Sequence, residues 1–151
     1  MPIVNLKSDL YRDEQAGGRV PDALLVKGRM KTATGTLTNG ATDLNTSMYL
    51  MAELPSHVII DPDTEFKVSG WGYVDLRIGT KTDVTAFVNL LVAAATTQPM
   101  VVKFDANHGK ALWEVAGLAE DPGGVIGIYA HAVANATGAG TMPFVIKYHD
   151  N

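Results

Sequence analysis

Histidines are the residues best suited to metal or proton chemistry in this sequence, and their spacing limits what they can do. His57, His108, His131 and His149 lie far apart in the chain, and none belongs to an HExxH motif or a His-x-His pair. His57 and His131 fall in predicted strands, His108 falls in an Asn-His-Gly turn, and His149 lies near the last residue. We therefore predict no metal ligand and no catalytic residue among them.

Carboxylates and hydroxyl groups form no stronger pattern. Asp61, Asp63 and Glu65 alternate as ligands of a hard cation can, but the glycine and the glutamate of an EF-hand loop are missing. Asp61-Pro62-Asp63 is instead typical of a turn. No serine lies in a GxSxG elbow, and no GxxxxGK or GxGxxG loop follows a predicted strand. The sequence predicts a protein that is not an enzyme and needs no cofactor.

Composition excludes further classes of protein. Without cysteine, the chain forms no disulfide scaffold, thiol nucleophile or cysteine-bound zinc site. The formal charge of −4 argues against general binding of nucleic acid. No apolar run approaches the length of a membrane-spanning helix, and the first residues lack the pattern of a secretory signal. We predict a protein that is used without export and binds neither nucleic acid nor membrane.

The elements that must position these residues are mainly strands, because short alternating or β-branched segments recur between turn signals. The predicted strands cover residues 27–38, 46–53, 57–60, 65–69, 73–78, 100–105, 125–134 and 144–148. Apolar spacing predicts a helix over 83–95, or a loop with one or two helical turns, and a short helix over 112–118. This pattern predicts an all-β fold, an antiparallel β-sandwich or jelly roll with one or two short helices.

The first part of the chain differs in charge from the rest. Residues 1–31 carry six bases and four acids, whereas residues 32–151 carry six bases and twelve acids. The segment YRDEQAGGRVPD combines mixed charge with a Gly-Gly pair and a proline, and such a segment buries little surface by itself. We predict an extended N-terminal arm over residues 1–26 and a β-sandwich domain over residues 27–151.

Several segments of the predicted sandwich resemble a known protein family. They are YLMAELPSHVII (49–60), YVDLRIGTKTD (73–83), LWEVAGLAEDPGGVIGIYAHAVA (112–134) and MPFVIKY (142–148). The similar features are a Leu-Pro turn before an apolar strand, a strand ending in Leu-x-Ile-Gly, and a Leu-Trp-Glu helix that leads through Asp-Pro-Gly-Gly into a strand. In these features the chain resembles the capsid decoration (cement) proteins encoded beside the major capsid protein of tailed bacteriophages. The segment 81–97 departs from the family pattern.

The resemblance implies a structural virion protein that binds the outside of a phage head and stabilises the capsid lattice. It implies the major capsid protein as partner, a homotrimer, and a place on the outer surface of the head after assembly in the host cytoplasm. For capsid contact we predict the basic arm residues Lys7, Arg12 and Arg19. For the oligomer interface we predict four apolar residues that we expect to be exposed, Met48, Met51, Phe87 and Trp113.

Two other functions stay open from the sequence. A carbohydrate- or receptor-binding β-sandwich on the virion surface would use exposed Trp71 and Tyr73 to stack on a sugar ring. A jelly-roll enzyme of the cupin type would need two or three of the histidines to meet in space. For Trp71 and Trp113, packing in the core is the alternative to any exposed role.

Overall fold

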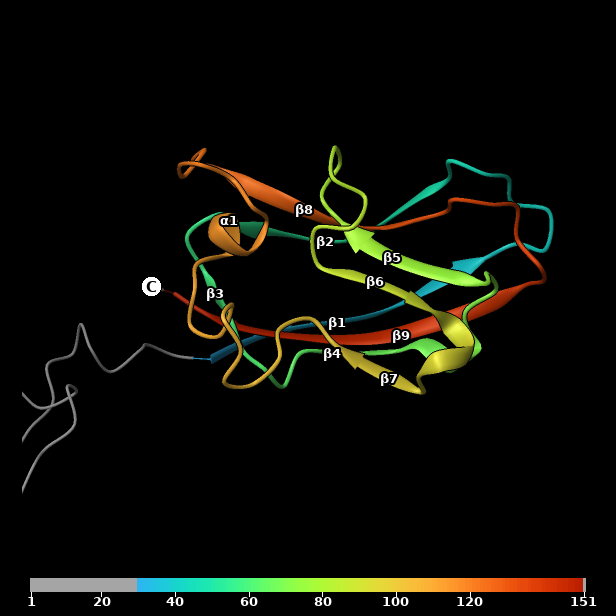
Figure 1. Cartoon of the computed structure of the whole chain (residues 1–151), viewed down its shortest axis with the longest axis horizontal. Helices are drawn as coiled ribbons and strands as arrows, with labels where there is room; N and C mark the ends of the chain where they lie inside the picture. The colour runs from blue at the N-terminus through green and yellow to red at the C-terminus, as the bar shows by residue number, and fades with distance from the viewer. Residues whose placement is uncertain (1–29, 151) are drawn as a thin grey trace, which may run out of the picture.

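Two antiparallel sheets packed face to face make up the fold in the computed structural model, which describes residues 30–150 (Figure 1). The five-stranded sheet has the order β1 (Met30–Asn39), β9 (Gly140–His149), β4 (Glu65–Lys67), β7 (Thr97–Pro99), and β3 (Ile59–Ile60) also pairs with β9. The four-stranded sheet has the order β2 (Met48–Pro55), β8 (Val125–His131), β5 (Asp75–Gly79), β6 (Val88–Leu91). The first strand pairs with the last and the second with the last but one, as in a jelly roll. The predicted fold class is confirmed.

Helical structure is brief in the described part of the chain. It consists of α1 (Leu112–Val115) and the 3₁₀ turns η2 (Val68–Gly70) and η3 (Val92–Ala94). The predicted helix at 112–118 is confirmed as α1, and Gly117 follows it at a φ of 81°, a conformation that favours glycine at a helix end. None of these helices is long and apolar enough to cross a membrane.

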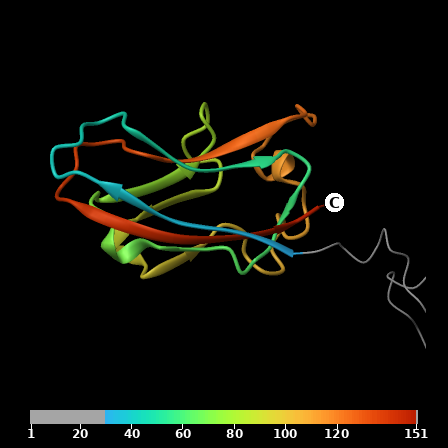
Figure 2. The same cartoon turned by 180° about the vertical axis from the view of Figure 1, so that it is seen from behind.

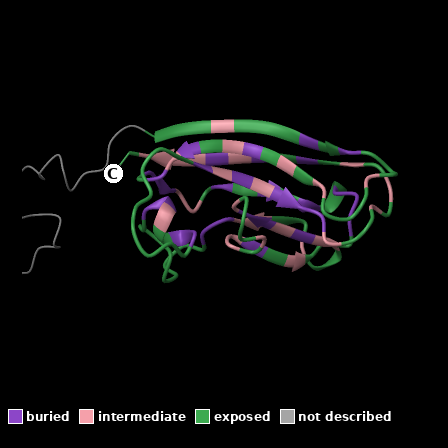
Figure 3. Ribbon diagram, turned by 90° about the horizontal axis from the view of Figure 1, so that it is seen from above, coloured by how far each residue is buried: buried purple, intermediate pink, exposed green. Residues whose placement is uncertain are grey.

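The core lies between the sheets and follows the alternation of the strands (Figure 3). In β9, Met142, Phe144 and Ile146 are buried between less buried neighbours, and in β5 both Leu76 and Ile78 are fully buried. Burying a side chain of this size stabilises the folded state by about 1.5–3 kcal/mol. A period of two is therefore enough to fix which face of each strand points inward.

Two predicted elements are wrong. The segment 83–95 is not a regular helix, because Val88–Leu91 pairs with β5 as strand β6, and only the single turn η3 follows. This outcome matches the alternative of a loop with a helical turn, extended by an edge strand. The segment 100–105 is not a strand. Met100 and Val101 are buried, but the chain then turns, with a hydrogen bond from Asp105 N to Val102 O.

Buried Asn39 holds one end of the sandwich together. Its Nδ2 donates to the carbonyl of Gly138 at 2.8 Å, and its Oδ1 accepts from the N–H of Gly72 at 3.1 Å. A Cβ at Gly72 would clash with Asn39 and with the Gly138 carbonyl, so this approach requires glycine. The end of β1 is thereby tied to the bend before β5 and to the loop before β9. At the opposite end, Met30 pairs with His149 (Figure 2).

Candidate interaction surfaces

The histidines do not come together as a metal site. His131 is buried in β8, where its Nε2–H donates to the carbonyl of Thr80 at 2.7 Å. His108 accepts a hydrogen bond at Nδ1 from the N–H of Phe104 at 3.1 Å. Within residues 30–150, no group of three or more His, Cys, Asp or Glu is placed to hold a metal ion. His131 and His108 therefore use a ring nitrogen to hold the backbone of neighbouring loops.

Ser56 and Asp121 form a pair that the sequence motifs did not reveal. The Oγ–H of buried Ser56 donates to Oδ1 of Asp121 at 2.5 Å, and the N–H of Gly123 donates to the same oxygen at 2.9 Å. These hydrogen bonds lower the pKa of Asp121, with the Ser56 bond as the largest cause. A buried serine whose proton is held by a carboxylate is a link between loops, since it is closed to substrate. It ties the turn after β2 to the segment before β8.

Trp71 and Tyr73 are buried, with 6% and 4% of their surface exposed, so Trp71 packs in the core and the exposure that a sugar-binding role needs from both residues is absent. Trp71 meets Tyr49 edge to face at 5.2 Å between ring centroids. The Tyr49 hydroxyl donates to Oδ2 of Asp43 at 2.5 Å and lies 2.7 Å from the Tyr73 hydroxyl. The Tyr49 hydrogen bond is the main cause that lowers the pKa of Asp43, and burial is the main cause that raises the pKa of Tyr49. This cluster anchors the loop before β2 and leaves neither Trp71 nor Tyr73 open to stack on a sugar.

The outward surface of the four-stranded sheet carries several exposed apolar side chains beside the charged residues Glu53, Asp75 and Arg77. The register pairs Leu50 with Tyr129 and Pro55 with Val125 across β2 and β8, so these residues share the outward side of the sheet. We call this surface the apolar face and define it by Met48, Leu50, Leu91, Val125 and Tyr129. The first four are 46%, 46%, 55% and 58% exposed, respectively. Exposed apolar residues that share one surface indicate an interaction site more strongly than single exposed apolar residues do.

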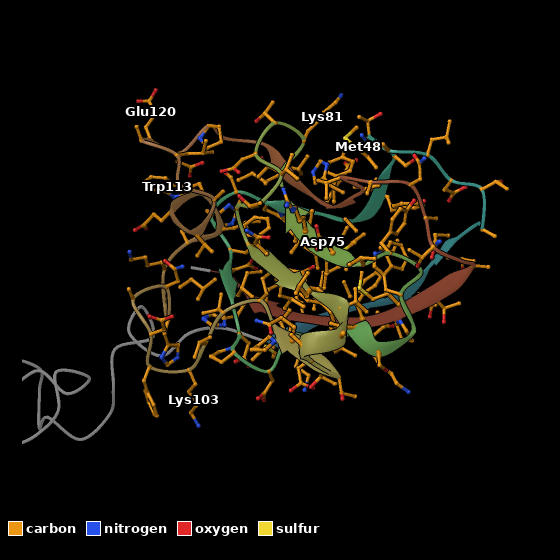
Figure 4. The ribbon with its side chains drawn as sticks, turned by 45° about the vertical axis from the view of Figure 1, so that its right-hand side comes forward. Met48, Asp75, Lys81, Lys103, Trp113 and Glu120 are labelled. Carbon is orange, nitrogen blue, oxygen red and sulfur yellow. The ribbon has the colours of Figure 1, made fainter. Side chains whose placement is uncertain are left out.

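The four residues predicted for an oligomer interface differ in burial, and Figure 4 shows Met48 and Trp113 well apart. Met48 is exposed and belongs to the apolar face, whereas Met51 is buried in the core at a bulge of β2, so its predicted exposure is wrong. Phe87 and Trp113 are half-buried and pack against the core from the loop before β6 and from α1. An interface role stays a prediction for Met48, Phe87 and Trp113.

This chain resembles a known protein in structure and not in sequence. No protein-family model matches the sequence, and no curated protein matches it. The chain is similar to a chain of the cyanophage Pam1 capsid asymmetric unit, with a TM-score of 0.57 and 14% identity over 100% of both chains. The two chains share a fold. At this level of identity the likeness shows the fold alone.

An exposed aromatic residue stands out on the loop between β7 and α1. Phe104 is 84% exposed and has a φ of 68°, a backbone region that bulky residues rarely adopt. The loop is nevertheless well bonded, because Phe104 N–H donates to His108 and the N–H of His108 donates to the carbonyl of Asp105. The Lys103 ammonium lies 5.3 Å from the centroid of the Phe104 ring. In Figure 4, Lys103 points away from the sandwich.

A shallow apolar groove of about 590 Å³ lies around η3, and we call it the η3 groove. It lies between η2, the bend at residues 73–74 and the loop at Thr137, and no charged side chain lines it. Its floor and walls are mainly small or branched apolar side chains, Val74, Leu91, Val92, Ala93 and Ala94. The turn η3, whose residues line the groove, and the loop between β7 and α1 lie toward opposite ends of the long axis of the molecule (Figure 1).

The predicted capsid contacts Lys7, Arg12 and Arg19, and the arm at 1–26, lie outside the described residues.

Proposed function

We propose that this protein is a structural virion protein that decorates the outside of a phage head and stabilises its lattice. The observation that carries the proposal is the likeness of the whole fold to a chain of a cyanophage capsid asymmetric unit. The sequence resemblance to tailed-phage decoration proteins, which rests on motifs in β2, β5, α1 and β8, supports the same function independently.

The chemistry of the described residues is consistent with this proposal. The polar groups best placed for chemistry, His131, Ser56 and Asp121, are engaged in hydrogen bonds that hold loops. Four of the ten large apolar side chains that are exposed in residues 30–150 lie on the apolar face. A surface of this kind fits a protein that acts by contact, and we assign the apolar face to the major capsid protein.

The proposed partner explains how a small sandwich could strengthen a large shell. A protein that binds the assembled lattice more tightly than its dissociated subunits stabilises the lattice by mass action. Binding as a homotrimer multiplies weak contacts, because the second and third contacts are intramolecular once the first has formed. The basic arm residues Lys7, Arg12 and Arg19 would add contacts to an acidic part of a neighbouring capsid subunit.

The test is co-sedimentation of the purified full chain with expanded heads that lack it. We expect saturable binding and a higher temperature of head disruption. Deletion of residues 1–20 should abolish this binding while the circular dichroism and thermal midpoint of the sandwich stay unchanged. Retained binding by the deleted chain would refute the role of the arm. Failure of the full chain to bind heads would refute the proposed function.

A further inference from the structure

The phenyl ring of Phe104 is barely buried by its own chain and adds little to the stability of the fold. Transferring an aromatic side chain of this size from water to a core is among the larger favourable contributions to folding, yet Phe104 remains 84% exposed. Its left-handed backbone adds a local cost that other residues at this position, above all glycine or asparagine, would reduce. The residue is thus poorly chosen for the stability of the isolated chain, and an observed outlier of this kind points to a function.

The loop holds Phe104 in place instead of letting it collapse onto the surface. His108 fixes the Phe104 backbone through its Nδ1 and meets the phenyl ring edge to face at 5.7 Å between centroids. Turn hydrogen bonds to the carbonyls of Val102 and Asp105 close the loop on both sides of the ring. An exposed, fixed aromatic side chain loses little conformational entropy when it enters a pocket, which is the property of an interface anchor.

The η3 groove offers a receptor of matching chemistry on the same chain. Its lining is apolar and uncharged, and Ala93 and Ala94 are small and exposed, so an incoming ring can approach the backbone closely. The volume of about 590 Å³ exceeds what one phenyl ring needs.

Because the anchor and the groove lie toward opposite ends of one molecule, they meet only between copies. We propose that Phe104 of one copy inserts into the η3 groove of the next copy. The contact joins two different surfaces, so it is heterologous, and it builds a ring when the rotation between successive copies closes. The proposal deepens the self-association that belongs to the proposed function by naming both surfaces. It covers Leu91, which also lines the η3 groove, and leaves the rest of the apolar face, in β2 and β8, free for the capsid.

The experiment measures the mass of the full chain by light scattering over a range of concentrations. The variants are Phe104→Ser in the anchor, Ala94→Glu in the groove, and Val102→Ser as a matched control on the same loop. All three positions are exposed, so the sandwich should keep its thermal midpoint. We expect Phe104→Ser and Ala94→Glu each to weaken self-association at least about thirtyfold, and Val102→Ser to change it less than about threefold.

Mixing the two interface variants gives the decisive readout. The Phe104→Ser chain keeps an intact groove and the Ala94→Glu chain keeps an intact anchor, so one productive contact remains between them. We expect each variant alone to be monomeric and an equimolar mixture to form a 1:1 heterodimer. A purely structural effect of either substitution would give no such recovery.

Several results would overturn the inference. These are an unchanged oligomer for Phe104→Ser, a mixture that stays monomeric, and a wild-type chain that is monomeric at the highest attainable concentration. Co-sedimentation of the same proteins with phage heads separates this inference from the proposed function. Head binding by a wild-type chain whose oligomer survives Phe104→Ser refutes the contact alone. Oligomers that dissociate as expected but never bind heads refute the capsid function alone.

Discussion

The outward surfaces of the two sheets differ sharply, although the same kind of β-sandwich core lies beneath both. On the four-stranded sheet, the apolar face exposes Met48 and Leu50 from edge strand β2. On the five-stranded sheet, edge strand β1 exposes a row of threonines. This row, which we call the threonine face, consists of Thr32, Thr34, Thr36 and Thr38.

The difference shows that a residue can favour strand formation without adding exposed apolar surface. Threonine is β-branched and favours strands, yet its hydroxyl keeps the surface polar. Edge strand β1 can therefore be ten residues long without an apolar outer surface. Leucine and methionine in β2 contribute no comparable advantage to an exposed strand. Their presence on the apolar face is consistent with selection for contact with another protein.

The largest expected effect comes from adding charge to one face and then to the other. Met48→Lys with Leu50→Lys should weaken binding to phage heads about a hundredfold or more, because each lysine would be buried unpaired against the capsid. The matched control, Thr34→Lys with Thr36→Lys, adds the same charge to the threonine face and should change binding less than about threefold. Co-sedimentation at several protein concentrations measures both. Loss of binding in the threonine pair alone would reverse the assignment of the faces.

A smaller effect is expected from breaking the link that joins the sheets at one end. Asn39→Ala removes the partner of the Gly72 N–H and the donor to the Gly138 carbonyl. Leaving such buried groups unpaired should lower the free energy of unfolding by about 1–3 kcal/mol. Urea denaturation measures the loss, with exposed Asn89→Ala as the control at less than about 0.5 kcal/mol. Equal losses in both variants would show that the link contributes nothing special.

The smallest expected effect is a loss of stability at low pH. It compares a carboxylate beside each of the two sheets. The pKa of Asp43, before β2, and that of Asp150, after β9, are both lowered from 3.8. Tyr49 is the main cause for Asp43, and Lys31 is the main cause for Asp150. A lowered folded-state pKa stabilises the protein above the unfolded-state value, and this stabilisation is lost as pH falls through the folded-state value.

The urea midpoint should therefore be unaffected by these two groups between neutral pH and about pH 5, and should fall below about pH 4. Asp43→Asn should flatten this acid dependence more than Asp150→Asn does, because the Asp150 pair with Lys31 is open to solvent and screened by salt. Urea titrations at pH 3 to 7 with and without salt would measure the difference. An acid dependence that both variants leave intact would contradict this explanation.

Much of the fold could be predicted from alternation alone. The strands β1, β2, β5, β8 and β9 lie where short alternating segments and turn residues place them. The segment 83–95 could not be assigned, because its apolar spacing fits a helix face as well as an edge strand. Pairing of Val88–Leu91 with β5 decides the outcome, and such long-range pairing is absent from a local pattern.

The site residues were harder to predict than the strands, for reasons visible in particular residues. Met51 follows Met48 by three residues, and side chains alternate along a strand. A regular strand therefore places these two residues on opposite sides of the sheet. The bulge at Met51 shifts the following register by one residue. Trp71 and Tyr73 precede β5 in a bend, where alternation no longer decides burial. Phe104 was assigned to a strand, and no sequence signal marked its left-handed turn.

The pairing of β1 with β9 has a consequence for the synthesis of this protein. β9 also pairs with β3 and β4, so three strands made early depend on one made more than a hundred residues after β1. Contacts so distant in sequence slow folding, because the entropy of closing a long loop is lost before the hydrogen bonds between the strands can form. On the ribosome, β4 can pair with β7 before β9 is made, but β1 and β3 have no partner strand until β9 emerges. Incomplete chains would therefore leave these strands unpaired and open to proteolysis, and only chains that include β9 would supply the sandwich that assembly requires.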